Sequence, residues 1–120
     1  GDLAKARDLV KSREVAPAEA RRLIDQNEVA VIDVRKATEY DAGHISGAQN
    51  SMHLRLPANL ENIPRDTPLL VHCQAGVRSA AATSLLEREG FDVINLAGGM
   101  NAWTAAGQPV EREPASAPSA

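Results

Sequence analysis

The chain has 120 residues, 43% of them hydrophobic, and a formal net charge of −3. This length fits one compact domain with a hydrophobic core. The charge excludes the basic surface that binds nucleic acid, and no apolar run approaches the roughly 20 residues that cross a bilayer. We therefore expect no nucleic-acid or membrane partner. The only cysteine, Cys73, excludes an internal disulfide and indicates a reducing, cytoplasmic location, in agreement with a charged N-terminal stretch that lacks a signal-peptide core.

Two helices are expected at the N-terminal end. Residues 3–11 carry apolar side chains at close to helical spacing, so we interpret residues 1–14 as an extra N-terminal helix or a linker. A second helix is predicted to begin near Pro17, because proline suits the first helical turn. Its predicted buried stripe consists of Ala16, Ala20, Leu23 and Ile24.

Three short apolar runs predict strands, at residues 29–35, 68–73 and 91–99, and the first of them is dense in β-branched residues. Such uninterrupted apolar runs are typical of parallel strands buried on both faces. Helical patterns lie between and after them, over residues 37–41, 78–89 and 100–105, with a short turn near 54–60. This alternation predicts an α/β fold with a mostly parallel central sheet flanked by helices on both faces. The tail, residues 112–120, is rich in Pro, Ala and Ser and is expected to be disordered.

The predicted strand 68–73 ends at Cys73, and open parallel sheets bind ligands at the carboxyl ends of their strands. Gly76 suits the tight loop that must follow, and the next helix points its free N–H groups and positive dipole end toward the sulfur. Arg78 adds a positive charge. Free cysteines are often inert core residues, but packing alone needs no such loop. We therefore predict a nucleophilic thiol with a pKa below the roughly 8.5 of free cysteine.

Four segments together resemble the rhodanese (sulfurtransferase) family over residues 15–111. They are Asp33-Val34-Arg35, EYDAGHISGA at 39–48, HCQAGVRS at 72–79 and LAGGMNAWTAAGQPV at 96–110. The resemblance implies that a sulfane sulfur passes from thiosulfate, glutathione persulfide or polysulfide to Cys73. The resulting persulfide would pass the sulfur to a thiol or cyanide acceptor, without a metal or organic cofactor. Family members are often fused to other sulfur-handling modules, so a fused or partner protein of that kind is a further expectation.

The loop after Cys73 supplies the expected binding residues. Backbone amides along the loop would stabilise the negative outer sulfur of a persulfide, as an oxyanion hole stabilises oxygen. Arg78 would complete this cradle. The predicted substrate-binding residues of the loop are Gln74, Ala75, Gly76, Val77, Arg78 and Ser79.

Two other functions fit the same fold. Cysteine phosphatases and arsenate reductases of this fold need an arginine six positions after the cysteine, whereas Arg78 follows Cys73 by five. The shorter loop suits a single sulfur atom better than a phosphate, and it holds no aspartate that could protonate a leaving group. A non-catalytic sulfur-carrier or regulatory binding module is the second alternative. Such modules lack the cysteine, which is present here.

Two charged residues near the end of the first predicted strand are further candidates. Asp33 and Arg35 lie two positions apart on a strand and therefore share a face. Arg35 is predicted to bind the substrate. The alternative is a structural ion pair between the two residues.

The remaining polar and aromatic candidates favour structural roles. Strand alternation directs His72 away from the nucleophile, so packing is expected rather than catalysis. His44 and His53 lack metal-site spacing, and no metal is expected. Gly98-Gly99 lacks a dinucleotide-binding pattern and is predicted to turn the last strand into the final helix. Trp103 is predicted to lie in the core or a pocket wall.

Overall fold

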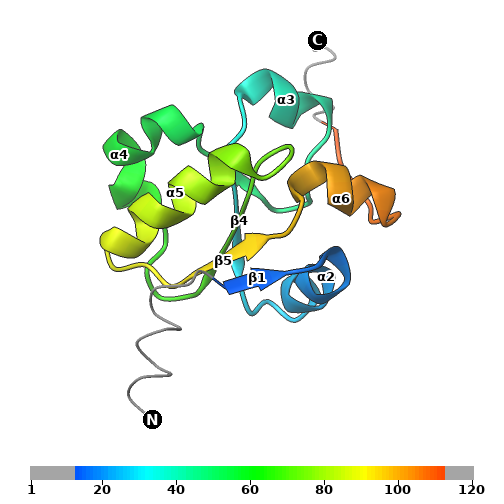
Figure 1. The fold of residues 1–120 in the computed structure, drawn as a ribbon, viewed down its shortest axis with the longest axis horizontal. Coiled ribbons are helices and arrows are strands. Elements are labelled where there is room, and N and C mark those ends of the chain that lie inside the picture. The colour runs from blue at the N-terminus through cyan, green and yellow to red at the C-terminus, as the bar shows by residue number, and fades with distance from the viewer. Residues whose placement is uncertain (1–12, 113–120) are drawn as a thin grey trace.

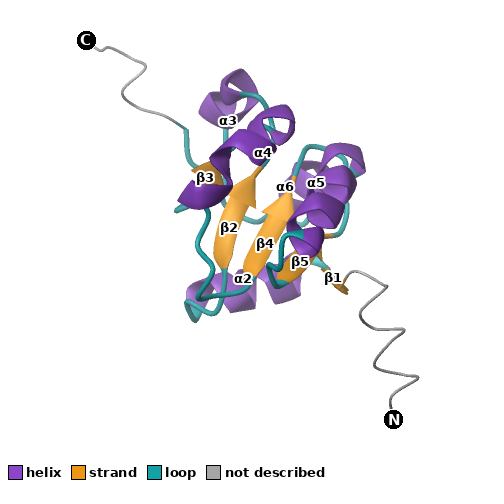
Figure 2. Ribbon diagram, turned by 90° about the vertical axis from the view of Figure 1, so that its left-hand side faces the viewer, coloured by secondary structure: helices purple, strands orange, loops and turns teal. Residues whose placement is uncertain are grey.

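Five parallel strands form the centre of the molecule in the computed structural model, which describes residues 13–112 (Figure 1). They lie in the order β1-β5-β4-β2-β3. Figure 2 shows β2 and β4 side by side with their arrowheads at the same end. The strand bounds are β1 Arg13–Val15, β2 Ala30–Asp33, β3 Gln49–Asn50, β4 Leu69–His72 and β5 Val93–Leu96.

Helices cover both faces of the sheet. Helices α2 and α6 pack on one face, and α4 and α5 pack on the other (Figure 1). Because both faces are covered, all four residues of the central strand β4 are buried. The helix bounds are α2 Pro17–Asp25, α3 Ala37–Ala42, α4 Leu56–Asn59, α5 Val77–Arg88 and α6 Gly99–Ala105, with 3₁₀ turns η1 His53–Arg55 and η2 Leu60–Asn62.

The sheet separates two apolar cores, because successive strand residues point to opposite faces. On β4, Leu69 and Val71 pack toward α5, where Leu86 is fully buried. Leu70 lies between them in sequence and packs on the other face with Trp103 of α6. The parallel sheet with helices on both faces confirms the predicted fold class. Residues 1–12, where the N-terminal helix is expected, lie outside the described residues, as do residues 113–120 of the predicted tail.

Two strands were missed by the sequence analysis. The strand β1 contributes only Arg13, Glu14 and Val15, of which the first two are exposed, and β3 has only two residues. Neither has the apolar run that identified the other strands. Since β1 pairs with β5, the sheet begins at Arg13, inside the segment that was interpreted as helix or linker. Within residues 13–112, no helix has the length and hydropathy needed to cross a membrane.

Candidate active site

The ends of β2 and β4 define the place where a site can form. From β2 the chain continues to β3 on one side, whereas from β4 it continues to β5 on the other side. In open parallel sheets a crevice opens where neighbouring connections diverge in this way. Arg35 follows the end of β2, and Cys73 directly follows the end of β4. The fold therefore brings two of the predicted site residues to one crevice.

Cys73 lies in a loop whose N–H groups surround its sulfur. The N–H of Gly76 donates to Cys73 Sγ at 3.0 Å. Gly76 has a φ of +117°, a conformation that favours glycine, and α5 begins at the next residue. The Cys73 residue is only 1% exposed. The thiol is therefore almost completely covered by protein atoms.

The hydrogen bonds in this loop favour the thiolate. Burial by itself raises the pKa of the Cys73 thiol. Hydrogen bonds from the Ser79 side chain and from the backbone N–H groups of Ser79, Gly76 and Ala75 act in the opposite direction, and the net effect lowers the pKa. The amides of Ala75, Gly76 and Ser79 thus point at the sulfur, and their role in binding a substrate stays a prediction.

The first residues of α6 form hydrogen bonds with the backbone carbonyl groups of this loop. The N–H of Met100 donates to the Cys73 carbonyl oxygen at 2.9 Å, and the N–H of Asn101 donates to the Gln74 carbonyl oxygen at 3.0 Å. In a trans peptide the C=O and the next N–H point in opposite directions. Fixing these two carbonyl groups toward α6 therefore directs the amides of Gln74 and Ala75 away from it.

Gly99 makes this close approach possible. A Cβ atom on Gly99 would lie 2.3 Å from the Cys73 carbonyl oxygen and 2.8 Å from that of Gln74. Its φ of +59° is also a conformation that L side chains rarely adopt. The glycine pair at the end of the last strand thus turns the chain into α6, as predicted, and Gly99 also allows α6 to contact the nucleophile's loop.

Arg35 forms a buried ion pair beneath the loop. Its Nη2 lies 2.7 Å from Asp33 Oδ2, and its Nε donates to Asp33 Oδ1 at 3.0 Å. Both side chains are almost fully buried. Arg35 also donates to the Gln74 side chain at 3.0 Å and to the Gly43 carbonyl oxygen at 2.7 Å. The structural ion pair considered above is therefore present, and a role of Arg35 in substrate binding stays a prediction.

His72 is fully buried and lies against the backbone of Cys73. Its Nδ1 is 3.3 Å from the Cys73 carbonyl oxygen, and its Nε2 is 3.6 Å from Asp33 Oδ2. Burial lowers the pKa of His72, although Asp33 opposes this effect. These contacts fit the packing role that strand alternation predicted.

Arg78 pairs with a residue that sequence reasoning did not assign to the site. Its Nη1 and Nη2 donate to the two carboxylate oxygens of Glu39 at 2.7 and 3.0 Å. Glu39 is the third residue of α3 and also accepts from the Lys36 N–H at 2.9 Å. The hydrogen bond from Arg78, which outweighs desolvation, lowers the pKa of Glu39 to about 2. The two residues are 39 positions apart, so only the fold brings them together.

The family model of the rhodanese-like domain matches residues 16–106. The chain belongs to the rhodanese-like family. It is 37% identical over 93 residues to a sulfurtransferase of Allochromatium vinosum, a match that covers 76% of this chain and 86% of that protein. A crystal structure of a rhodanese-related protein from Thermoplasma volcanium superimposes with a TM-score of 0.80 at 31% identity, covering 84% of this chain and 99% of that one.

A longer relative contains the same region. The chain is 35% identical over 108 residues to the probable adenylyltransferase/sulfurtransferase MoeZ of Mycobacterium tuberculosis. This match covers 87% of the chain but only 28% of MoeZ, so the chain spans a little more than a quarter of that relative. Similarity to proteins named sulfurtransferases supports a sulfurtransferase activity in general terms.

Two further loop residues of this rhodanese-like domain do not face the sulfur. Gln74 accepts from Arg35 and donates to the Asn101 side chain at 2.7 Å. The Val77 residue is 80% exposed and projects into solvent. The binding roles predicted for the backbone amides of Gln74 and Val77 stay predictions, and the Gln74 side chain connects the loop to its surroundings.

A pocket of about 360 Å³ borders the loop of the rhodanese-like domain. Arg35 and Gln74 line it, together with Glu39 from α3 and Met100 from α6. Arg112 completes the charged part of its wall. The pocket therefore extends from Gln74, in the loop that follows Cys73, to Glu39 of α3.

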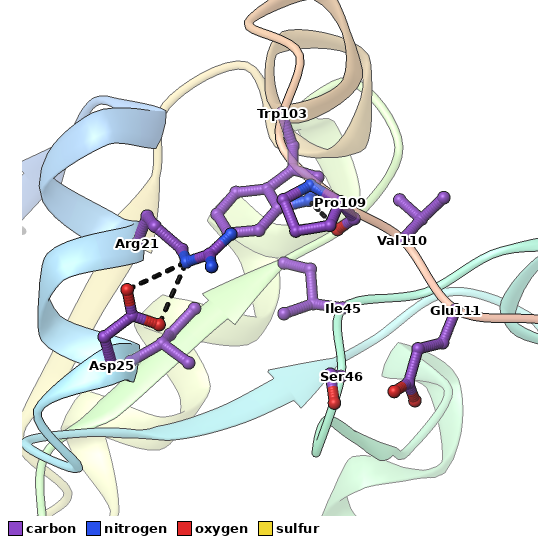
Figure 3. A pocket seen from close by; sticks show the side chains of 9 residues that line it. Arg21, Asp25, Ile45, Ser46, Trp103, Pro109, Val110 and Glu111 are labelled. Atoms are coloured by element: carbon purple, nitrogen blue, oxygen red, sulfur yellow. Dashed lines mark hydrogen bonds and ion pairs between the residues drawn. The ribbon is translucent and has the colours of Figure 1, made fainter.

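A second pocket, of about 390 Å³, contains none of the predicted site residues (Figure 3). Arg21 extends over it and bonds to Asp25, and Trp103 lies in its wall with Nε1 donating to the Pro109 carbonyl oxygen at 2.8 Å. Trp103 is 1% exposed, in agreement with the predicted core or wall position. Among residues 13–112, no group of three His, Cys, Asp or Glu side chains could hold a metal ion.

Proposed function

We propose that this protein is a sulfurtransferase that carries a sulfane sulfur on Cys73 as a persulfide, from a small-molecule donor to a thiol or cyanide acceptor. The observation that carries the proposal is the hydrogen bond from the Gly76 N–H to Cys73 Sγ, at 3.0 Å, inside a loop of converging amides. The similarity to proteins named sulfurtransferases supports the same reaction class.

In the first half-reaction the Cys73 thiolate attacks the outer sulfur of the donor. The bond between the two donor sulfurs breaks, and its electron pair leaves with sulfite or a thiolate. The new outer sulfur on Cys73 bears a negative charge, which the loop N–H groups stabilise. In the second half-reaction the acceptor attacks this outer sulfur, and Cys73 leaves as a thiolate. A lowered thiol pKa assists both its attack and its departure.

The Arg78 contacts favour sulfur transfer over phosphate chemistry. Both terminal nitrogens of Arg78 already bind the Glu39 carboxylate. A phosphate or arsenate would have to displace Glu39 to receive the bidentate contact that arginine gives to oxyanions. The persulfide needs only the backbone amides.

The proposal is tested by loading the protein with sulfur. We expect intact-mass spectrometry to show a gain of one sulfur atom after incubation of the wild type with polysulfide or another sulfane donor. Cys73→Ser should show no gain, since the hydroxyl does not form a persulfide, and its circular dichroism should match the wild type. A wild type that gains no sulfur, or a Cys73→Ser variant that transfers it normally, would contradict the proposal.

A further inference from the structure

Arg35 and Arg78, which lie beside the loop that follows Cys73, are each paired with a carboxylate. Arg35 is paired with Asp33 at 2.7 Å, and both are almost fully buried. Arg78 is paired with Glu39 through two hydrogen bonds. Arg112, which lines the adjacent pocket together with Arg35, is exposed, so water and salt screen its charge. The loop therefore stabilises an anion chiefly through neutral N–H groups.

The Arg78–Glu39 pair is a fixed part of this arrangement. The Glu39 and Arg78 side chains are only 31% and 26% exposed. Glu39 is held a third time by the Lys36 N–H at the start of α3. Because the pKa of Glu39 is about 2, its carboxylate stays charged at every pH at which the thiolate forms.

We propose that Glu39 selects the class of sulfur donor: by neutralising Arg78, it favours organic hydropersulfides, whose sulfurs carry at most one negative charge, over the dianion thiosulfate. The inference rests on the proposed sulfurtransferase function and assigns a donor class to the same site. Glu39 touches Arg78 and acts through it, so it is a specificity-determining residue rather than a catalytic one.

Charge decides between the two donors. The Cys73 thiolate is negative, so attack on thiosulfate brings three negative charges together, and an unpaired Arg78 would offset this repulsion. With Glu39 in place, that positive charge is cancelled. Attack on a hydropersulfide forms the bond from Cys73 to the outer sulfur and breaks the bond between the two donor sulfurs. The departing thiolate takes up the proton that the outer sulfur loses, so no oxidant or reductant is needed.

The pocket beside the loop fits the organic part of such a donor. It has a volume of about 360 Å³, and its wall includes Gln74, the residue that directly follows Cys73. Apolar side chains of Ala42, Met100 and Val110 contribute to its wall. Thiosulfate has no apolar group to bury there, whereas the carbon chain of an organic persulfide does.

The test compares Glu39→Gln with Glu19→Gln. Glutamine keeps the side-chain acceptor for the Lys36 N–H but removes the charge. We expect kcat/KM for thiosulfate to rise about five- to tenfold in Glu39→Gln. For an alkyl hydropersulfide whose carbon chain bears no charge, kcat/KM should change by less than about twofold. Glu19 is a matched control, because it is also the third residue of its helix and also binds an arginine, Arg22, through two hydrogen bonds. Glu19→Gln should leave both values unchanged.

Two further measurements separate charge from structure. Glu39→Asp keeps the charge and should retain the wild-type ratio of the two donors. The dependence of the thiosulfate reaction on ionic strength should weaken in Glu39→Gln but not in Glu19→Gln, since salt screens the repulsion that the first variant has already reduced. Thermal unfolding of all three variants checks that each is folded.

The outcomes distinguish this inference from the proposed function. Equal changes for both donors in Glu39→Gln, or no change for thiosulfate, would overturn the role of Glu39 while leaving sulfur transfer intact. If neither donor loads sulfur onto the wild type, the proposed function itself fails, and the donor preference fails with it.

Discussion

At the scale of single residues, Cys73 owes its lowered pKa to neutral donors. Burial alone would raise the pKa of this thiol, and the groups that reverse the effect are the Ser79 side chain and three backbone amides. The Ser79 hydroxyl is fully buried and donates to the Gly76 carbonyl oxygen at 3.2 Å. Ser79 is the only side chain among the groups that lower the pKa of this thiol.

Removing this hydroxyl should make the thiol less acidic. We expect Ser79→Ala to raise the pH midpoint of Cys73 alkylation by roughly one pH unit, because a hydrogen bond to a charged group is lost. The measurement is the rate of modification by iodoacetamide, a reagent small enough for a buried thiol, as a function of pH. Ser84→Ala, at an exposed position of the same helix, is the control and should not shift the midpoint. An unshifted midpoint in Ser79→Ala would assign the stabilisation to the amides alone.

At the scale of secondary structure, the site depends on how α6 meets the loop after β4. The two N–H bonds from α6 to the carbonyl groups of Cys73 and Gln74 fix the loop from the side opposite the sulfur. At position 99, glycine is the only residue type that leaves room for both carbonyl oxygens. A side chain at this position must displace the loop, the helix or both.

We therefore expect Gly99→Ala to impair catalysis more than folding. Its Cβ would lie 2.3 Å from the Cys73 carbonyl oxygen, so the amides should lose their alignment with the sulfur. The sulfur-loading rate should fall at least tenfold, roughly the effect of a weakened anion-stabilising donor, and the alkylation midpoint should rise. Gly107→Ala is the matched control: Gly107 also has a positive φ, +78°, but nothing lies within 4 Å of an added Cβ. Equal losses in both variants would attribute the effect to backbone strain.

The same elements show what the sequence could predict. The strands β2, β4 and β5 were predicted because their buried apolar residues follow one another, and Cys73 was predicted as a site residue from the loop that follows it. The strands β1 and β3 were not, because they are short and polar and are strands only through their pairing partners. The contact of Arg78 with Glu39 was missed for a related reason. It joins two helices whose packing no local pattern encodes.

At the scale of the whole molecule, β5 connects one edge of the sheet to its centre. It pairs with β1 on one side and with β4 on the other. We expect a chain that ends at Asp92 to remain unfolded, because it lacks both β5 and α6, and β1 would have no partner. Limited proteolysis and circular dichroism would show this, with a chain that ends at Arg112 as the folded control. A protease-resistant core in the shorter chain would contradict the prediction.

The pairing of β1 with β5 also sets the order of events during synthesis. Glu14 and Asn95 are register partners on these strands and are 81 positions apart. At the usual 5 to 20 residues per second, a ribosome makes Asn95 about 4 to 16 seconds after Glu14. The segment that fixes the Cys73 loop, Gly99 to Asn101, emerges later still. In the nascent domain the loop around Cys73 is therefore fixed only after all five strands of the sheet have been made.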